Sequence, residues 1–235
     1  MVLWRDLRFM RLILLSMFGR KFWVLPMLPL LWLGFIALAV GLDPNEMIRA
    51  EEVLGTLLGI PMTVLGIYFG MRIIAGEIED RSLEVAYTVP GGSHRLWLLK
   101  LWGGFLLLLA AEMILATVVA SLITFFPFNA IYGAMQASFF YMALSMAMST
   151  LFRNEIAGAV FTISILALNG LITDFGENQL PISPFWNPEM VTGADVTEVF
   201  AWSVQNRVGM ILVICGMICL AFMRANRRER MLTDS

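Results

Sequence analysis

Residues 101–126 read LWGGFLLLLAAEMILATVVASLITFF, a run of 26 residues whose only charged member is Glu112. An α-helix needs about 20 apolar residues to cross the hydrocarbon core of a bilayer, which is roughly 30 Å thick. Odd and even positions of the run are both apolar, so it lacks the alternation of a half-buried strand. Because a bilayer leaves backbone amides to be satisfied within the segment, the run predicts a transmembrane helix.

The composition of the whole chain also favours a membrane protein. Of its 235 residues, 59% are hydrophobic and 14% are charged, whereas soluble domains have roughly 45–50% and 25%. A formal charge of −2 lacks the basic excess that nucleic-acid binding needs, so we expect no nucleic-acid partner. With one histidine and two cysteines, the chain has few ligands for a metal site, and we expect none. Cys215 and Cys219 fit apolar packing better than a metal pair.

Five further stretches approach or exceed the spanning length. The six expected spans are 22–42, 53–75, 101–126, 130–151, 156–175 and 207–223. The last two are the weakest, because Asn169 interrupts one and the other is short at its outer end. We therefore predict an all-α integral membrane protein, a single transmembrane domain of six helices over residues 1–235 with a basic tail at 224–235.

The distribution of arginine and lysine predicts the orientation, because loops on the cytoplasmic side carry an excess of these residues. With the N-terminus inside, thirteen of the sixteen lie on the inner side. They are Arg5, Arg8, Arg11, Arg20, Lys21, Arg81, Arg95, Lys100, Arg153, Arg224, Arg227, Arg228 and Arg230. Only Arg49 and Arg207 fall outside, and Arg72 lies near the inner end of the second span, where its side chain can reach the interface. We therefore expect both termini in the cytoplasm. The chain itself is expected in the inner (cytoplasmic) membrane of the cell.

Residues 1–21 precede the first span and hold five basic residues and one acidic residue. At 100° per residue, the apolar side chains of this segment fall in one stripe, with Arg5, Arg8 and Arg11 on the other side. The pattern predicts an interfacial helix lying on the inner leaflet. The alternative is a frayed basic flank that only sets the topology.

The inner loop at 76–100 reads GEIEDRSLEVAYTVPGGSHRLWLLK and begins with a cluster of acidic residues. Glu77, Asp80 and Glu84 have i, i+3, i+7 spacing, which places them on one face of a helix that continues from the second span. Pro90-Gly91-Gly92 then breaks the helix, and a new one is expected from Ser93 into the third span. The acidic face predicts either docking of a basic partner or a solvated surface, and the residues alone leave both open.

The spacing within this loop resembles the signature of permease subunits of type-2 ATP-binding-cassette (ABC) transporters. The run E-x-E-x-x-[ST]-L-E, followed by Pro and then Lys, has seven positions in place. These are Glu77, Glu79, Ser82, Leu83, Glu84, Pro90 and Lys100. Arg81-Ser82 stands where the family usually has Gly-Thr. The outer loop at 176–206, with Leu180-Pro181 and Ser183-Pro184-Phe185, is similar to a Pro-containing stretch of the family.

The resemblance implies an exporter permease that is not itself an enzyme and that moves a small amphipathic compound, a lipid or a peptide. ATP and Mg would be bound by a separate cytoplasmic ATPase subunit, present in two copies, and the permease would pair with a second copy of itself or a homologous permease. A cytoplasmic coupling helix would dock in the ATPase. The resemblance assigns ATPase coupling to Glu77, Glu79, Asp80, Ser82, Leu83 and Glu84, with a lesser contact from Arg153, Asn154 and Glu155. In agreement, the chain contains no G-x-x-x-x-G-K-[ST] phosphate loop.

Three polar residues inside the expected spans are candidates for a translocation path: Glu112, Gln136 and Asn169. Glu112 lies 12 residues beyond Lys100, hence about 18 Å into the membrane at 1.5 Å per residue. A carboxyl group there is costly unless it is paired, protonated or hydrated, which makes it a functional-site hypothesis. It either lines the path or forms a structural hydrogen bond to Gln136 or Asn169, and both alternatives stay open.

Two other classes of function compete with an exporter. An intramembrane hydrolase would need partners for a carboxylate pair such as Glu51-Glu52, but the only histidine, His94, lies in the inner loop. A channel or scaffold without an ATPase is the other class, and such a protein has no need of the acidic inner motif. We therefore expect an exporter permease.

Overall fold

The structure is a computed structural model of the chain, and it describes residues 2–42, 53–80, 87, 92–173, 180–191 and 193–226. Within these ranges every regular element is a helix, which confirms the all-helical prediction. The elements are α1 (Val2–Phe18), η1 (Phe22–Met27), α2 (Pro29–Leu42), η3 (Leu54–Gly59), α3 (Ile60–Ile73), α4 (Ala75–Glu79), α6 (Ser93–Leu122), α7 (Phe128–Phe152), α8 (Glu155–Thr173), η5 (Pro188–Met190) and α9 (Val196–Ala225).

Among the described residues, four helical segments are long and apolar enough to cross a membrane. They are Val53–Ile73, Ser93–Leu122, Glu155–Thr173 and Val196–Ala225. A fifth candidate is a bent pair, Met10–Phe18 with Phe22–Leu38, whose two parts meet at 79°. The chain is therefore a multi-pass membrane protein with four or five such segments, and the count of six spans stays a prediction.

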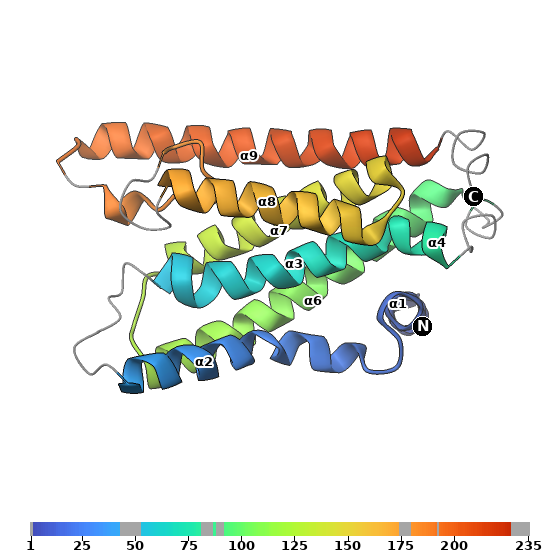
Figure 1. Cartoon of the computed structure of the whole chain (residues 1–235), viewed down its shortest axis with the longest axis horizontal. Helices are drawn as coiled ribbons and strands as arrows, with labels where there is room; N and C mark the ends of the chain where they lie inside the picture. The colour runs from blue at the N-terminus through green and yellow to red at the C-terminus, as the bar shows by residue number, and fades with distance from the viewer. Residues whose placement is uncertain are drawn as a thin grey trace.

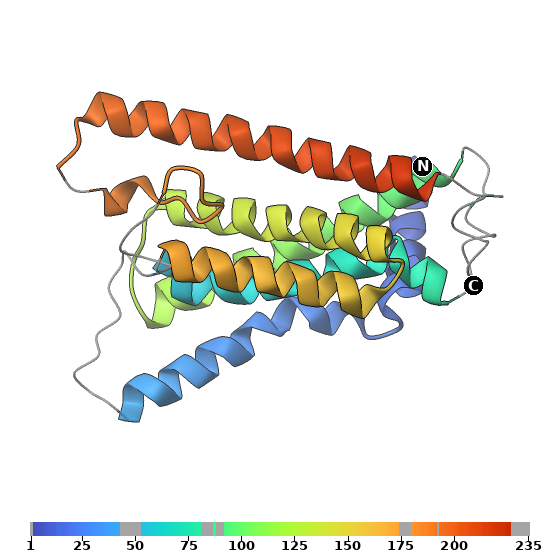
Figure 2. The same cartoon turned by 45° about the horizontal axis from the view of Figure 1, so that its top comes forward.

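The long helix α7 is not among these candidate spans, because it is not apolar enough. It lies at the centre of the bundle. It packs against α3, α8 and α9, and Figures 1 and 2 show these helices surrounding it. Most of its buried positions are small or weakly polar, as at Ala134, Ser138 and Ser145. Because protein rather than lipid covers α7, the helix does not need a strongly apolar surface, and small residues let its neighbours approach closely.

Glycines bring the backbones of α3 and α8 against α7. A Cβ added at Gly66 would lie 2.5 Å from the carbonyl oxygen of Ser138, and one at Gly70 would meet the carbonyl oxygen of Met142 even more closely. Gly66 and Gly70 form a G-x-x-x-G pair, the spacing that permits close helix contact in membranes. On α8, a Cβ at Gly158 would overlap the backbone of α7 in the same way. The close packing of these three helices thus depends on the absence of side chains at these glycines.

The N-terminal helix α1 lies across one end of the bundle, where Figure 1 shows it nearly along its axis. Ile13, Leu14 and Met17 are buried, whereas Arg11 and Arg20 are exposed. This two-sided burial agrees with the amphipathic pattern predicted for residues 1–21, and its place at a membrane interface stays a prediction. The next expected span, 22–42, is divided into η1 and α2, because the prolines at 26 and 29 lack the amide donors that a continuous α-helix uses.

The last helix, α9, is longer than the sequence predicts. It begins at Val196, whereas residues 196–206 are expected in the outer loop. The polar residue Asn206 lies on this added portion and is satisfied by the segment 180–187, to which it donates hydrogen bonds. A helical start with polar residues is therefore stable here because a neighbouring loop supplies the acceptors.

Candidate functional site

A network of charged side chains joins four segments at the end of the bundle where α1 and α4 lie (Figure 1). At its centre is Arg72, in the last turn of α3. Nη1 of Arg72 donates to both carboxylate oxygens of Glu155, at 3.0 and 3.1 Å, and Nε donates to the backbone carbonyl of Met17 at 3.3 Å. Nη2 lies 4.0 Å from the carboxylate of Asp80. Arg72 thus connects α3 with α1, α8 and the end of α4, instead of extending freely to the interface as the sequence predicts.

A second ion pair at this end is more deeply buried. Oε1 of Glu77 accepts a hydrogen bond from Nζ of Lys100 at 2.6 Å, and Oε2 accepts one from the indole Nε1 of Trp97 at 2.9 Å. The side chains of Glu77 and Lys100 are each 7% exposed. The prediction that Glu77 belongs to an exposed acidic face is therefore wrong, because the side chains of Lys100 and Trp97 on α6 reach the carboxylate and enclose it. Its contribution is to hold α4 against α6.

The turn between α7 and α8 is shaped by its own capping interactions. Arg153 ends α7 in the left-handed region, with φ at 57°. Oδ1 of Asn154 accepts a hydrogen bond from the backbone N–H of Ala157 at 2.7 Å and so caps α8. The backbone N–H of Glu155 donates to Oε1 of Glu79 at 2.8 Å. The first turn of α8 is therefore satisfied partly by its cap and partly by a carboxylate from α4.

The two segments predicted to contact an ATPase lie side by side. A Cβ added at Gly76 in α4 would be 2.9 Å from Oε1 of Glu155, so a glycine permits this approach. Of the predicted coupling residues in the inner loop, Glu79 and Asp80 are exposed and Glu77 is not. Ser82, Leu83 and Glu84 lie outside the described residues.

The end of α9 is attached to the same region, which sequence reasoning missed. The hydroxyl of Tyr87 donates to the backbone carbonyl of Ala225 at 2.6 Å. The rings of Trp97 and Phe222 pack with centroids 5.7 Å apart, and His94 lies edge-on to Trp97 at the same centroid distance. The cluster of aromatic residues in the inner loop and near the C-terminus was the available signal, but spacing alone could not pair them.

A separate polar cluster lies at the opposite end of the bundle, where residues 180–187 fold against α7 and α9 (Figure 1). Nε2 of Gln136 donates to Oδ1 of Asn206 at 2.8 Å. Nδ2 of Asn206 in turn donates to the backbone carbonyls of Pro181 and Ser183, at 2.7 and 2.9 Å. This chain of amide hydrogen bonds fixes the loop to both helices.

Arg207 completes this cluster without a carboxylate partner among the described residues. Its Nη1 donates to Oε1 of Gln136 and its Nη2 to Oδ1 of Asn129, both at 2.9 Å. The guanidinium carbon also lies 4.2 Å from the ring centroid of Tyr132. Neutral amide oxygens and a cation–π contact thus satisfy a cation that the sequence places at the outer end of the last span.

Of the two alternatives for Glu112, the structural hydrogen bond to Gln136 or Asn169 is not present among the described residues. Glu112 is fully buried, and neither of its carboxylate oxygens has a hydrogen-bond partner among the described residues. Gln136 instead contacts α9, and Oδ1 of Asn169 accepts a hydrogen bond from Ser183 at 3.3 Å. Helix spacing could not decide this alternative, because the outer loop and α9 supply the partners of Gln136 and Asn169. A path-lining role for the three residues stays a prediction.

Within the described ranges, no group of three or more His, Cys, Asp and Glu side chains is placed to hold a metal ion. Comparisons of the chain with models of known protein families, with curated proteins and with solved structures find no match. The functional interpretation therefore depends on the geometry of the chain itself, above all on the junction formed by α4, the 153–155 turn and Arg72.

Proposed function

We propose that the chain is the permease subunit of a type-2 ABC exporter, moving a small amphipathic compound, a lipid or a peptide. ATP would be hydrolysed by a separate cytoplasmic ATPase subunit. The observation that carries the proposal is the direct hydrogen bond from the backbone of Glu155 to Glu79, together with the ion pair between Glu155 and Arg72. These contacts unite the two segments, 76 residues apart at Glu79 and Glu155, for which the family resemblance implies contact with the ATPase.

The junction is well placed to pass a displacement into the membrane helices. Arg72 lies in the last turn of α3, and Glu155 is the first residue of α8. Movement of α4 therefore acts on the ends of both helices. Both helices meet α7 through glycine contacts between backbones. Packed interfaces of this kind move as units rather than deforming gradually. A motor that pushes on α4 would therefore shift α3 and α8 relative to the rest of the bundle.

In the proposed arrangement the junction faces the cytoplasm and α7 is the central one of six spans, with both termini inside. Two permease chains, identical or homologous, pair in the inner membrane, and each binds one ATPase copy. The permease chain itself binds no cofactor, and ATP with Mg is held by the partner. The exposed carboxylates of Glu79 and Asp80 contribute to the docking surface for a basic groove on that partner.

The proposal is tested by purifying the tagged chain from its native membranes and measuring ATP hydrolysis by whatever subunit with a G-x-x-x-x-G-K-[ST] loop remains bound. Asp80→Lys reverses a charge that is 63% exposed and should release that subunit. Glu77→Lys is unsuitable, because it would leave Lys100 without its buried partner. Glu198→Lys, an exposed reversal in the first turn of α9, is the matched control and should retain the ATPase.

Two results would contradict the proposal. One is a chain that purifies intact from native membranes without any ATPase. The other is full retention of the ATPase by Asp80→Lys and also by the double variant Asp80→Lys, Glu84→Lys. Ion conductance by the isolated chain would then favour a channel, and cleavage of a membrane peptide would favour a hydrolase.

A further inference from the structure

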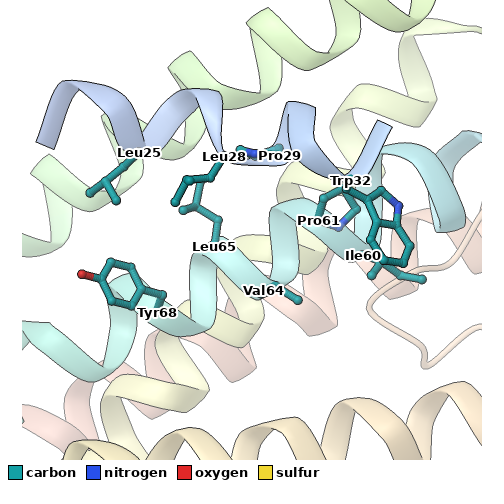
Figure 3. A pocket seen from close by; sticks show the side chains of 9 residues that line it. All are labelled: Leu25, Leu28, Pro29, Trp32, Ile60, Pro61, Val64, Leu65 and Tyr68. Atoms are coloured by element: carbon teal, nitrogen blue, oxygen red, sulfur yellow. The ribbon is translucent and has the colours of Figure 1, made fainter. Parts of the chain in front are cut away.

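An apolar groove of about 590 Å³ lies between α3 and the η1–α2 segment (Figure 3). Its lining comprises Leu25, Leu28, Pro29, Trp32, Ile60, Pro61, Val64, Leu65 and Tyr68. The indole N–H of Trp32 is already used, since it donates to the backbone carbonyl of Thr56 at 2.8 Å. The volume lies within the range of about 300–1,000 Å³ that small-molecule sites span. The part of a ligand that enters this groove must therefore be apolar.

The backbone creates this groove, so it does not depend on one side-chain conformation. The prolines at 26 and 29 interrupt the helical hydrogen-bond pattern between α1 and α2. Beyond this interruption α2 diverges from the bundle, as Figure 2 shows. Pro61 in the first turn of α3 also lines the opposite wall. The space between the two segments is thus built into the course of the chain.

Two cations precede the groove in the chain, on the side where its lining begins at Leu25. Arg20 and Lys21 are exposed and directly precede η1, whose Leu25 lines the groove near Tyr68 (Figure 3). Neither cation forms an ion pair with a described carboxylate. Along α3 the lining extends from Ile60 to Tyr68, which corresponds to about 12 Å at 1.5 Å per residue. A ligand that matches both features carries a negative charge at one end and a long apolar chain beyond it.

We infer that the groove binds one anionic phospholipid, with its head group at Arg20 and Lys21 and one acyl chain between α2 and α3. Basic residues at the membrane surface attract anionic lipids, whereas a zwitterionic head group offers no net charge to two cations that pair with no described carboxylate. The acyl chain fills space that the helices leave open and so supports the position of α2. This inference does not depend on a transport function.

The lipid site is tested by native mass spectrometry of the full chain, purified in detergent and exposed to equal amounts of phosphatidylglycerol and phosphatidylcholine. One phosphatidylglycerol should be retained in preference to phosphatidylcholine. The double variant Arg20→Gln, Lys21→Gln should lower that preference by roughly tenfold or more, because each cation contributes to the attraction. Arg95→Gln removes another exposed cation, on α6, and should leave the preference unchanged.

A second pair of variants tests the groove separately from the charges. Val64 lines the groove and is 55% exposed, and Val160 on α8 lies outside it and is 57% exposed. Val64→Trp should fill the groove and lower phosphatidylglycerol retention, whereas Val160→Trp should not. Equal retention of the two lipids, or equal effects of the two tryptophans, would overturn the inference. Efficient crosslinking between two chains carrying Val64→Cys would also overturn it, because a second copy would then occupy the groove.

Discussion

Replacing Arg72 with glutamine removes the guanidinium that serves Glu155, Met17 and Asp80 at once. The carboxylate of Glu155, 7% exposed, then loses the only cation that pairs with it among the described residues. Removing one partner of a buried ion pair costs about 3–5 kcal/mol. Because the side chain of Arg72 is 28% exposed, water reaches part of the vacated site, and we expect a smaller loss of about 2–3 kcal/mol in the free energy of unfolding.

The loss can be measured as a shift in the thermal unfolding midpoint. In a chain of this size, 1 kcal/mol corresponds to about 2–4 °C, so Arg72→Gln should lower Tm by about 4–12 °C. Intrinsic tryptophan fluorescence of the protein in detergent follows the transition. Arg95→Gln, which removes an exposed cation from α6, should shift Tm by much less.

A double-mutant cycle separates the pair from the other contacts of Arg72. Glu155→Gln alone should also destabilise the protein, but combining it with Arg72→Gln should cost less than the sum of the two. The interaction energy should be about 0.5–3 kcal/mol, the range found for residues that share a salt-bridge network. Strictly additive losses would refute the reasoning, because they would show that Arg72 and Glu155 act independently despite contacts of 3.0 and 3.1 Å.

Three further changes are expected to alter stability or loop accessibility. Gly70→Ala should destabilise the protein by about 1–3 kcal/mol, because the added Cβ meets a carbonyl of α7, while Gly209→Ala, with open space around it, is the control; equal Tm values for the two would contradict this. Glu112→Leu should raise the unfolding free energy by about 1–3 kcal/mol, since it removes a buried carboxyl that no described side chain pairs with, and a fall in Tm would contradict this. Asn206→Ala removes two hydrogen bonds to the 180–187 loop, worth about 1–2 kcal/mol together, and should speed proteolysis of that loop; unchanged cleavage would mean that other contacts hold it.

The membrane class and the helices could be predicted because they depend on local properties. A run such as 101–126 is expected to be helical in a bilayer whatever its neighbours are, since its amides have no other acceptors, and α6 covers it up to Leu122, four residues short of the predicted end. The helix expected from Ser93 is likewise present, as the start of α6. The segment 130–151 is helical as predicted, but nothing in its apolar count indicated that α7 would lie at the centre.

Side-chain partners were less predictable, because they join distant parts of the chain. Arg72 and Glu155 are 83 residues apart, and Gln136 and Asn206 are 70 apart. Spacing along a helix reports which residues share a face, but it does not report what that face meets. For this reason an acidic cluster was read as an exposed surface, although Glu77 is enclosed by Lys100 and Trp97.

The amino-acid order alone determined that this chain enters a membrane, that it does so as helices, and that charge gathers in the segments between them. Which helix is surrounded by the others, and which carboxylate meets which cation, were decided only by tertiary packing. The physical reason is that lipid and protein interior are both apolar. A helix face that touches lipid and one that touches another helix therefore differ little in hydropathy, and only close backbone contact and paired polar groups distinguish them.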